Sequence, residues 1–294
     1  TSGSGLNFAT DSSANTITNN GTIQGGNGLN FNGGNDFTVI NNGLIDSTGG
    51  TTFYGLANFG SGMTLTNNEG ATISGSHGVI NGSASTGGTT INNAGSITSD
   101  EGNAGVAIKL YGSNNTINLN TSSDITGDIQ LETGQTGNVL NLLGGSASVG
   151  TFGNNVNSNS INTLNINAPG VEWDLTNTLP VAGAINLIAG NVVVTGDLSS
   201  TAAGGTTIGS GTTLQIGDGG TAGTLDSVVV NNGTLTFNRS DDLTFADNIS
   251  GTGVVAQTGS GVTNLAGSGT WSGGTQVTSG TLNGMAATNA LGTA

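Results

Sequence analysis

The chain has 294 residues, of which 55 are glycine, and only 6% of its residues are charged. Seventeen acidic residues against two strong bases, Lys109 and Arg239, give a formal net charge of −15 at neutral pH. This charge repels phosphate backbones and anionic membrane surfaces, so no nucleic acid and no anionic membrane is expected as a partner. Asn, Thr, Ser and Gly favour turns and strands over helix interiors, so the composition predicts an all-β protein.

A short pattern recurs from the beginning of the chain. Residues 16–23 read TITNNGTI, a strand, an Asn-Asn-Gly turn and a second strand. Similar text returns at 38–45, 64–73, 90–97, 116–126 and 228–237. A unit of about 22 residues cannot bury its apolar side chains alone, but stacked copies can bury them against one another. The repeat therefore predicts a right-handed parallel β-helix, a solenoid of about 13 coils.

The asparagines of the repeated turn are expected to have a structural role. Asn and Gly tolerate the positive φ angles that a tight turn between two strands requires. Amide side chains aligned in successive coils can also form a ladder of hydrogen bonds, which satisfies buried polar groups. This structural role is predicted for Asn19, Asn41, Asn67 and Asn92 and for their neighbours.

The spacing divides the chain into three regions. Residues 1–135 form regular coils with Asn-Asn-Gly turns, and residues 136–200 keep the alternation of a β-helix but lose that turn. Both prolines lie in this second region, so a loop excursion is expected near 168–181. Residues 201–294 form a third region with shorter repeated blocks.

The third region carries motifs of a known family. The blocks GTTLQIGDGG (211–220), NNGTLTFNRSDD (231–242) and WSGGT (271–275) resemble the autotransporter-associated strand repeats of type V autotransporter passengers. Trp271 stands where the family usually has tyrosine. The close resemblance covers about 85 residues, and the earlier coils are similar to passengers of the AIDA type by their pattern alone.

This resemblance implies a β-helical rod on the surface of a Gram-negative cell, or released from it. It also implies that the protein has its own C-terminal β-barrel, absent from this sequence, which anchors it in the membrane. In AIDA-type relatives such passengers promote self-association, biofilm growth, attachment and virulence. The implied partner is therefore another copy of the chain on a neighbouring cell. A host matrix protein or glycan, bound without self-association, and a passive surface stalk are the alternatives.

No catalytic site, cofactor or metal site is expected. A Ser-His-Asp triad needs a histidine base, and the one histidine, His77, lies in a glycine-rich turn without a Gly-x-Ser-x-Gly motif. A glycosidase needs two carboxyl groups close together, whereas Asp124 and Asp128 are four residues apart along a strand. The glycine-rich run 25–37 resembles a calcium-binding nonapeptide, but Asp36 is its single acid, and one carboxylate makes a poor calcium site. A turn permitted by the glycines is expected there instead.

Two surfaces are candidates for binding. Polar loops of the regular coils are the expected self-association surface, with solvated loops as the alternative interpretation. Their residues are Asn35, Asp36, Asp46, Thr48, Asn81, Asp100 and Glu101. The run 51–59 concentrates aromatic residues, and Tyr54 is the candidate for stacking on a ligand. The alternative for this run is that Phe53 and Phe59 belong to the core of an enlarged coil.

Overall fold

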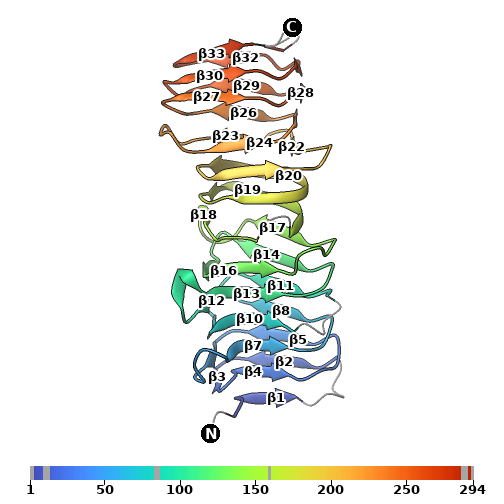
Figure 1. Cartoon of the computed structure of the whole chain (residues 1–294). Coiled ribbons are helices and arrows are strands. Elements are labelled where there is room, and N and C mark those ends of the chain that lie inside the picture. The colour runs from blue at the N-terminus through green and yellow to red at the C-terminus, as the bar shows by residue number, and fades with distance from the viewer. Residues whose placement is uncertain (1–2, 9–13, 83–86, 158–159, 286–290, 293–294) are drawn as a thin grey trace. The chain divides into compact units, whose positions relative to one another are not determined.

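The computed structural model describes residues 3–8, 14–82, 87–157, 160–285 and 291–292. It is a parallel β-solenoid, which confirms the fold class expected from the repeat (Figure 1). The number of turns is about 12, close to the 13 expected. The described helical structure is a single 3-10 turn, η1 (Gly102–Ala104). Unit 1 comprises Thr1–Asn141 with Asn154–Ile161, and unit 2 comprises Leu142–Gly153 with Asn162–Ala294.

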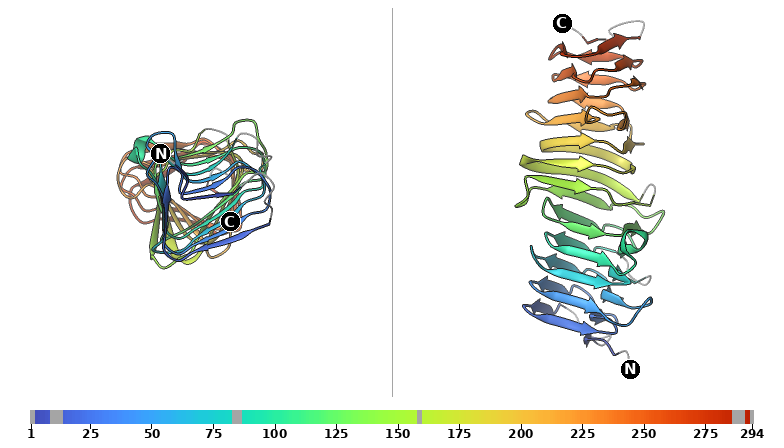
Figure 2. Two further views of the ribbon diagram at one scale, coloured as in Figure 1. Left: turned by 90° about the horizontal axis from the view of Figure 1, so that it is seen from below. Right: turned by 90° about the vertical axis from the view of Figure 1, so that its left-hand side faces the viewer.

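Unit 1 is built from three parallel sheets, to which successive turns add strands in order (Figure 2). Sheet A consists of β1 (Leu6–Phe8), β4 (Leu29–Phe31), β7 (Tyr54–Asn58), β10 (His77–Asn81), β13 (Val106–Leu110) and β16 (Asp128–Leu131). Sheet B includes β2 (Thr16–Asn19), β5 (Thr38–Asn41), β8 (Thr64–Asn67), β11 (Thr90–Asn93) and β14 (Thr116–Asn120). Sheet C consists of β3 (Thr22–Gly25), β6 (Leu44–Ser47), β9 (Thr72–Gly75), β12 (Ser96–Ser99) and β15 (Asp124–Thr126).

The core of unit 1 consists of apolar side chains stacked in columns along the turns. In sheet B, Val39 pairs with Leu65, Leu65 with Ile91, and all three are fully buried. Each β-branched or leucine side chain therefore meets its equivalent one strand spacing away, about 4.8 Å. Phe31 and Phe37 add a stacked aromatic pair, with ring centroids 4.0 Å apart and both side chains fully buried.

A ladder of buried asparagines lines the turn that follows sheet B. The Nδ2 atom of each residue donates to the Oδ1 atom of the next over 2.8 Å, in the order Asn19, Asn41, Asn67 and Asn93. The predicted ladder is therefore present, but its fourth rung is Asn93 rather than Asn92. The register explains the correction, because Asn93 pairs with Asn67 whereas Asn92 pairs with Thr66. The Asn92 amide instead accepts from Asn118 in an adjacent row.

Unit 2 repeats the same principle with shorter turns, and strands of its last turns recur every 19 to 21 residues. Within strand β17 (Val139–Leu143) the chain passes from unit 1 to unit 2, after Asn141. The strands that follow are β18 (Val149–Phe152), β19 (Ile161–Leu175), β20 (Leu179–Val194), β21 (Asp197–Ser200), β22 (Thr206–Ile208), β23 (Thr213–Ile216), β24 (Thr224–Asp226), β25 (Val229–Asn231), β26 (Thr234–Phe237), β27 (Asp242–Phe245), β28 (Ile249–Gly251), β29 (Val254–Gln257), β30 (Val262–Leu265), β31 (Gly269–Trp271), β32 (Thr275–Val277) and β33 (Thr281–Gly284).

The loop excursion expected near 168–181 is wrong. Residues 168–175 belong to the long strand β19, and 179–181 begin β20, which pairs in turn with β21, β22 and β23. Each long strand bends around the core, and Pro169 lies at such a bend beside Gly170, whose φ is +78°. A proline at a bend needs no loop, because its missing N–H falls where the ladder is already interrupted.

Candidate binding surface

The outer side of sheet A and the residues that follow its strands carry a patch of four rings and one cation, which we call the aromatic face. Its members are Tyr54, Phe59, His77, Lys109 and Tyr111. The Tyr54 ring lies 5.4 Å from the His77 ring and 6.5 Å from the Phe59 ring, centroid to centroid. The Lys109 Nζ atom lies 5.7 Å from the centre of the Tyr111 ring, a cation–π contact. Phe59 is 37% exposed, so this ring is on the surface and does not join the core as the alternative interpretation proposed.

Pairing between strands positions these side chains. Tyr54 on β7 pairs with His77 on β10, and three residues further on, Ile80 pairs with Lys109 on β13. Ala57 and Ile80 precede Lys109 in the same column, and both are buried. The aromatic face therefore lies over a small apolar base on the outer side of the sheet.

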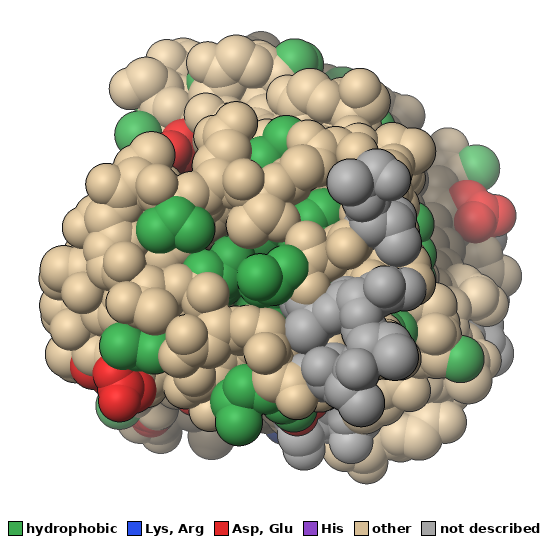
Figure 3. Space-filling model, turned by 90° about the horizontal axis from the view of Figure 1, so that it is seen from above, with side chains coloured by type: hydrophobic (Ala, Val, Ile, Leu, Met, Phe, Trp, Pro, Cys, Tyr) green, Lys and Arg blue, Asp and Glu red, His purple; other side chains and the backbone are tan. Residues whose placement is uncertain are grey.

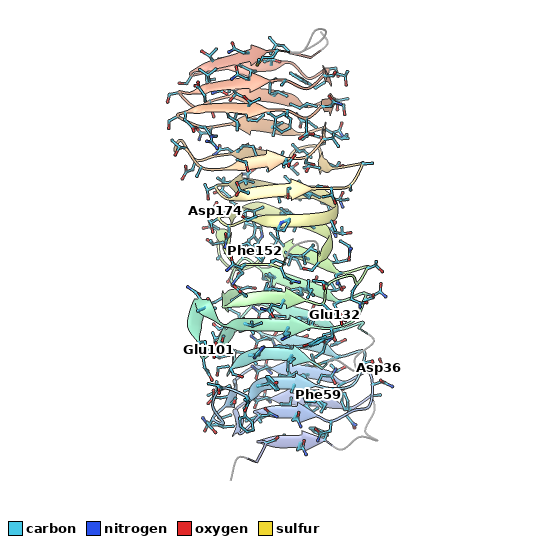
Figure 4. All side chains as sticks on the ribbon, viewed as in Figure 1. Asp36, Phe59, Glu101, Glu132, Phe152 and Asp174 are labelled. Atoms are coloured by element: carbon cyan, nitrogen blue, oxygen red, sulfur yellow. The ribbon has the colours of Figure 1, made fainter. Side chains whose placement is uncertain are left out.

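A cavity of about 140 Å³ lies where the aromatic face ends. It is bounded by Lys109, Leu110, Tyr111, Gln130, Leu131, Glu132 and Asn157, so it belongs wholly to unit 1. Leu110 and Leu131 are buried and form an apolar floor. The Oε2 atom of Glu132, the residue labelled in Figure 4, accepts a hydrogen bond of 3.0 Å from the backbone N–H of Gly112, which fixes this carboxylate in the lining of the cavity. The cavity thus combines a cation, an acceptor and an aromatic ring over an apolar floor.

His77 is half-buried in the aromatic face. Burial lowers the pKa of its imidazole, the charge of Lys109 lowers it further, and Glu101 opposes them. The ring is therefore neutral at physiological pH. Its Nδ1 atom is buried and has no hydrogen-bond partner among the described residues. A catalytic histidine needs a partner that orients the ring, and Tyr54 contacts this ring only by its edge.

Four of the predicted contact residues lie at the end of sheet C, in what we call the acidic corner: Asp46, Thr48, Asp100 and Glu101. The Asp46 carboxylate accepts from Gln24 Nε2 over 2.7 Å and from Ser74 Oγ over 2.6 Å. Thr48 donates to the Gly25 carbonyl over 3.0 Å. Burial and the charge of Asp46 raise the pKa of Asp100. The structure therefore brings these four residues to one region.

The other three predicted contact residues lie elsewhere. Asp36 and Glu101 occupy opposite edges of unit 1 (Figure 4). Asn35 and Asp36 form a turn that leads into β5 of sheet B, and Asn35 bridges to Ser61. Asn81 is fully buried and donates to Thr89 Oγ1 and to the Tyr111 carbonyl, both over 3.1 Å. As a contact residue Asn81 was therefore a wrong prediction, because its amide is used inside the coil.

Replacing Asp100 with asparagine should stabilise the protein slightly at neutral pH. A carboxyl group whose folded pKa is raised contributes stability below its unfolded pKa, which is lost as the pH rises through the folded value. The expected gain is about 0.3 kcal/mol, because the group is largely solvated. Thermal unfolding between about pH 2 and pH 7 checks this, and the difference between variant and parent should vanish below the ordinary carboxyl pKa of about 4.

Asp241 provides the contrast for this experiment. Its hydrogen bonds with the Arg239 side chain lower its pKa, so Asp241→Asn should reduce stability at neutral pH and converge with the parent on acidification. If both variants shift stability in the same direction at neutral pH, the assignment for Asp100 is wrong.

The two strong bases of the chain have different environments. Arg239 is 8% exposed and binds Asp241 with two parallel hydrogen bonds of 2.8 and 2.7 Å, while its Nη1 atom donates to the Gly223 carbonyl. Lys109 makes no ion pair with any carboxylate that the structure describes. Arg239 therefore has a structural role in unit 2, whereas Lys109 lines the cavity of unit 1.

Unit 2 has an open depression of about 430 Å³ on β19, β20 and β23, lined partly by Glu172, Asp174 and Asp218. Burial and the charge of Asp218 raise the pKa of Asp174. Apolar side chains are exposed at the C-terminal end of this unit (Figure 3); they include Val277 and Met285.

Within the described ranges, no group of three or more His, Asp or Glu residues is placed to hold a metal ion. None of the described helical structure is long and apolar enough to cross a membrane.

Sequence reasoning identified Tyr54 but missed the Lys109 cavity. Lys109 lies on β13, Tyr111 directly follows β13 and Glu132 directly follows β16, so only the register of β13 with β16 joins them. One signal was available, since Lys109 is one of only two strong bases and lies two residues from a tyrosine.

Comparison with known proteins found one informative similarity. A segment of 54 residues is 54% identical to part of the adhesin BmaC autotransporter of Brucella suis biovar 1 (strain 1330). The match covers 18% of this chain and 2% of that protein, so the chain corresponds to a very small part of its relative. No family model matches the sequence, and no solved structure matches it. The partial similarity to an autotransporter adhesin and the β-solenoid fold are together consistent with an autotransporter passenger.

Proposed function

We propose that this chain is part of the passenger of a bacterial surface adhesin, and that it holds another copy of itself without performing a reaction. The partial similarity to an autotransporter adhesin supports a surface or extracellular location and an adhesive role. Contact between two copies is the mode that the outer side of sheet B favours.

The observation that carries this proposal is a column of threonines in register on sheet B. The column contains Thr16, Thr38, Thr64, Thr90 and Thr116, one from each of five successive turns. Just past the other end of the same strands, the side chains of Asn20, Asn42 and Asn68 form a second, outer ladder with hydrogen bonds of 2.8 and 2.6 Å. A second copy presents hydroxyl and amide groups with the same spacing of about 4.8 Å, so hydrogen bonds can form turn by turn along the contact.

Charge also favours sheet B. Its five strands in unit 1 contain no charged residue. Two chains of charge −15 repel each other, but at physiological salt only charges within about 8 Å act strongly. Contact through sheet B keeps the acidic corner outside this surface, while Asn35 and Asp36 lie at its edge.

Sedimentation velocity of the purified chain at several protein and salt concentrations tests this proposal. The parent should self-associate at micromolar concentration. Thr64→Glu should weaken association at least about tenfold, because two copies would then bring like charges together. Thr72→Glu makes the same charge change on sheet C of the same turn and should leave association unchanged. A parent that stays monomeric at about 100 µM would refute self-association.

A second candidate function, binding of a host ligand, is favoured by the aromatic face and its cavity. Partly exposed rings beside a cation that pairs with no described carboxylate are typical of surfaces that recognise a ligand rather than of a stalk. In this mode the chain attaches a cell to a host glycan or matrix protein, and self-association is not required.

A further inference from the structure

We infer that the cavity beside Lys109 binds a single sugar ring that carries a carboxylate, as in a uronic or a sialic acid. This inference rests on the ligand-binding form of the proposed function and gives it a site and a ligand class. The charge, the shape and the hydrogen-bonding groups of the cavity each favour this ligand class.

Charge selects the carboxylate. The Lys109 ammonium makes no ion pair with the described carboxylates, although the chain has 17 acidic residues to offer. The ammonium contacts the Tyr111 ring but no described carboxylate, so an anionic ligand group can supply the missing charge-assisted hydrogen bond. The overall charge of −15 opposes long polyanions, so one local carboxylate suits the site better than a highly sulfated chain.

The lining selects a sugar over a simple anion. Tyr111 supplies an aromatic ring, and Leu110 with Leu131 supplies an apolar floor, against which the C–H groups of a pyranose can pack. Glu132 is held by the Gly112 N–H through one oxygen, and its other oxygen makes no hydrogen bond with the described residues. That oxygen can accept from a sugar hydroxyl, and the Gln130 amide can donate to another.

Size limits the ligand to one ring. Sites for drug-sized ligands occupy roughly 300–1,000 Å³, whereas this cavity measures about 140 Å³. The cavity therefore has room for the carboxylate and the part of the ring that bears it, and the rest of the sugar and its glycan would extend along the aromatic face toward His77 and Tyr54.

Ligand-observed NMR of the whole chain with four probes tests this inference. Glucuronic acid and N-acetylneuraminic acid distinguish the two sources of the carboxylate, glucose lacks it, and acetate lacks the sugar. We expect at least one acidic sugar to bind and both glucose and acetate to bind at least about tenfold more weakly. Acetate binding as well as the acidic sugars would overturn the sugar assignment. Glucose binding as well would overturn the role of Lys109.

Variants locate the site. Lys109→Met should weaken binding of the acidic sugar about tenfold, and Lys109→Arg should retain most of it. Tyr111→Ala should weaken binding severalfold while Tyr111→Phe keeps it, because stacking needs only the ring. Unchanged binding in Lys109→Met would overturn the inference, and far-UV circular dichroism verifies that each variant is folded. Sedimentation of the same samples reports self-association separately, so failure of the site is distinguished from failure of the adhesive contact between copies.

Discussion

Replacement of Asn41 by alanine is expected to lower the free energy of unfolding by about 2–3 kcal/mol, because it leaves buried polar groups without partners. Asn41 is fully buried, accepts from Asn19 and donates to Asn67 and to the carbonyls of Gly43 and Thr72. Removing it interrupts the ladder in the middle, so the amides on both sides each lose a hydrogen bond. Urea denaturation followed by far-UV circular dichroism measures the loss.

Asn42 is the matched control because it is the next residue and has the same side chain. It is exposed and belongs to the outer ladder, through Asn20 and Asn68. Asn42→Ala should therefore change stability by less than about 0.5 kcal/mol. Equal losses in the two variants would show that the inner ladder has no special role in stability.

Replacement of Phe31 by alanine is expected to cost about 3–5 kcal/mol, the range for truncating a buried aromatic side chain and leaving a cavity. Phe31 is fully buried, and its ring stacks on Phe37 at 4.0 Å and on Phe8 at 5.1 Å, centroid to centroid. Neighbouring turns are held by the continuous backbone ladders of the sheets, so they cannot collapse far into the space. The same urea experiment measures this loss.

Phe59→Ala is the control for this substitution, since it removes the same ring from the surface of unit 1. With 37% of the side chain exposed, its loss should cost less than about 1 kcal/mol. Tryptophan fluorescence adds a second readout, which reports the unfolding of unit 2, because Trp173 and Trp271 both lie in that unit. A Phe31→Ala variant as stable as Phe59→Ala would contradict the arrangement of the core.

The solenoid could be predicted because its cause is repeated in the sequence. Four copies of one pattern place an apolar residue, a polar residue and an asparagine at equivalent positions, and a fifth copy has Leu119 in place of the asparagine. Stacking follows from the need to bury the apolar column. The error of one residue at Asn92 has a simple origin. Residues 92 and 93 are both asparagine, and only the register with Thr66 and Asn67 shows which of them enters the ladder.

The binding surface was less predictable because it depends on which turns lie next to each other. Tyr54 and His77 meet across adjacent strands, and Lys109 joins them through a further strand. The turn lengths of 22 and 26 residues in unit 1 vary through loops that the pattern does not constrain. Asn81 shows the opposite error, since a polar residue in a loop-like context is used inside the coil.

The settling rate of bacterial cells that display this chain on their surface tests the proposed adhesive role most directly. Cells with the parent chain should settle from a standing culture, cells with Thr64→Glu should remain suspended, and cells with Thr72→Glu should settle like the parent. Parent-displaying cells that stay suspended as long as undecorated cells would contradict adhesion between copies. Equal loss of settling in both glutamate variants would contradict the assignment of sheet B as the contact surface.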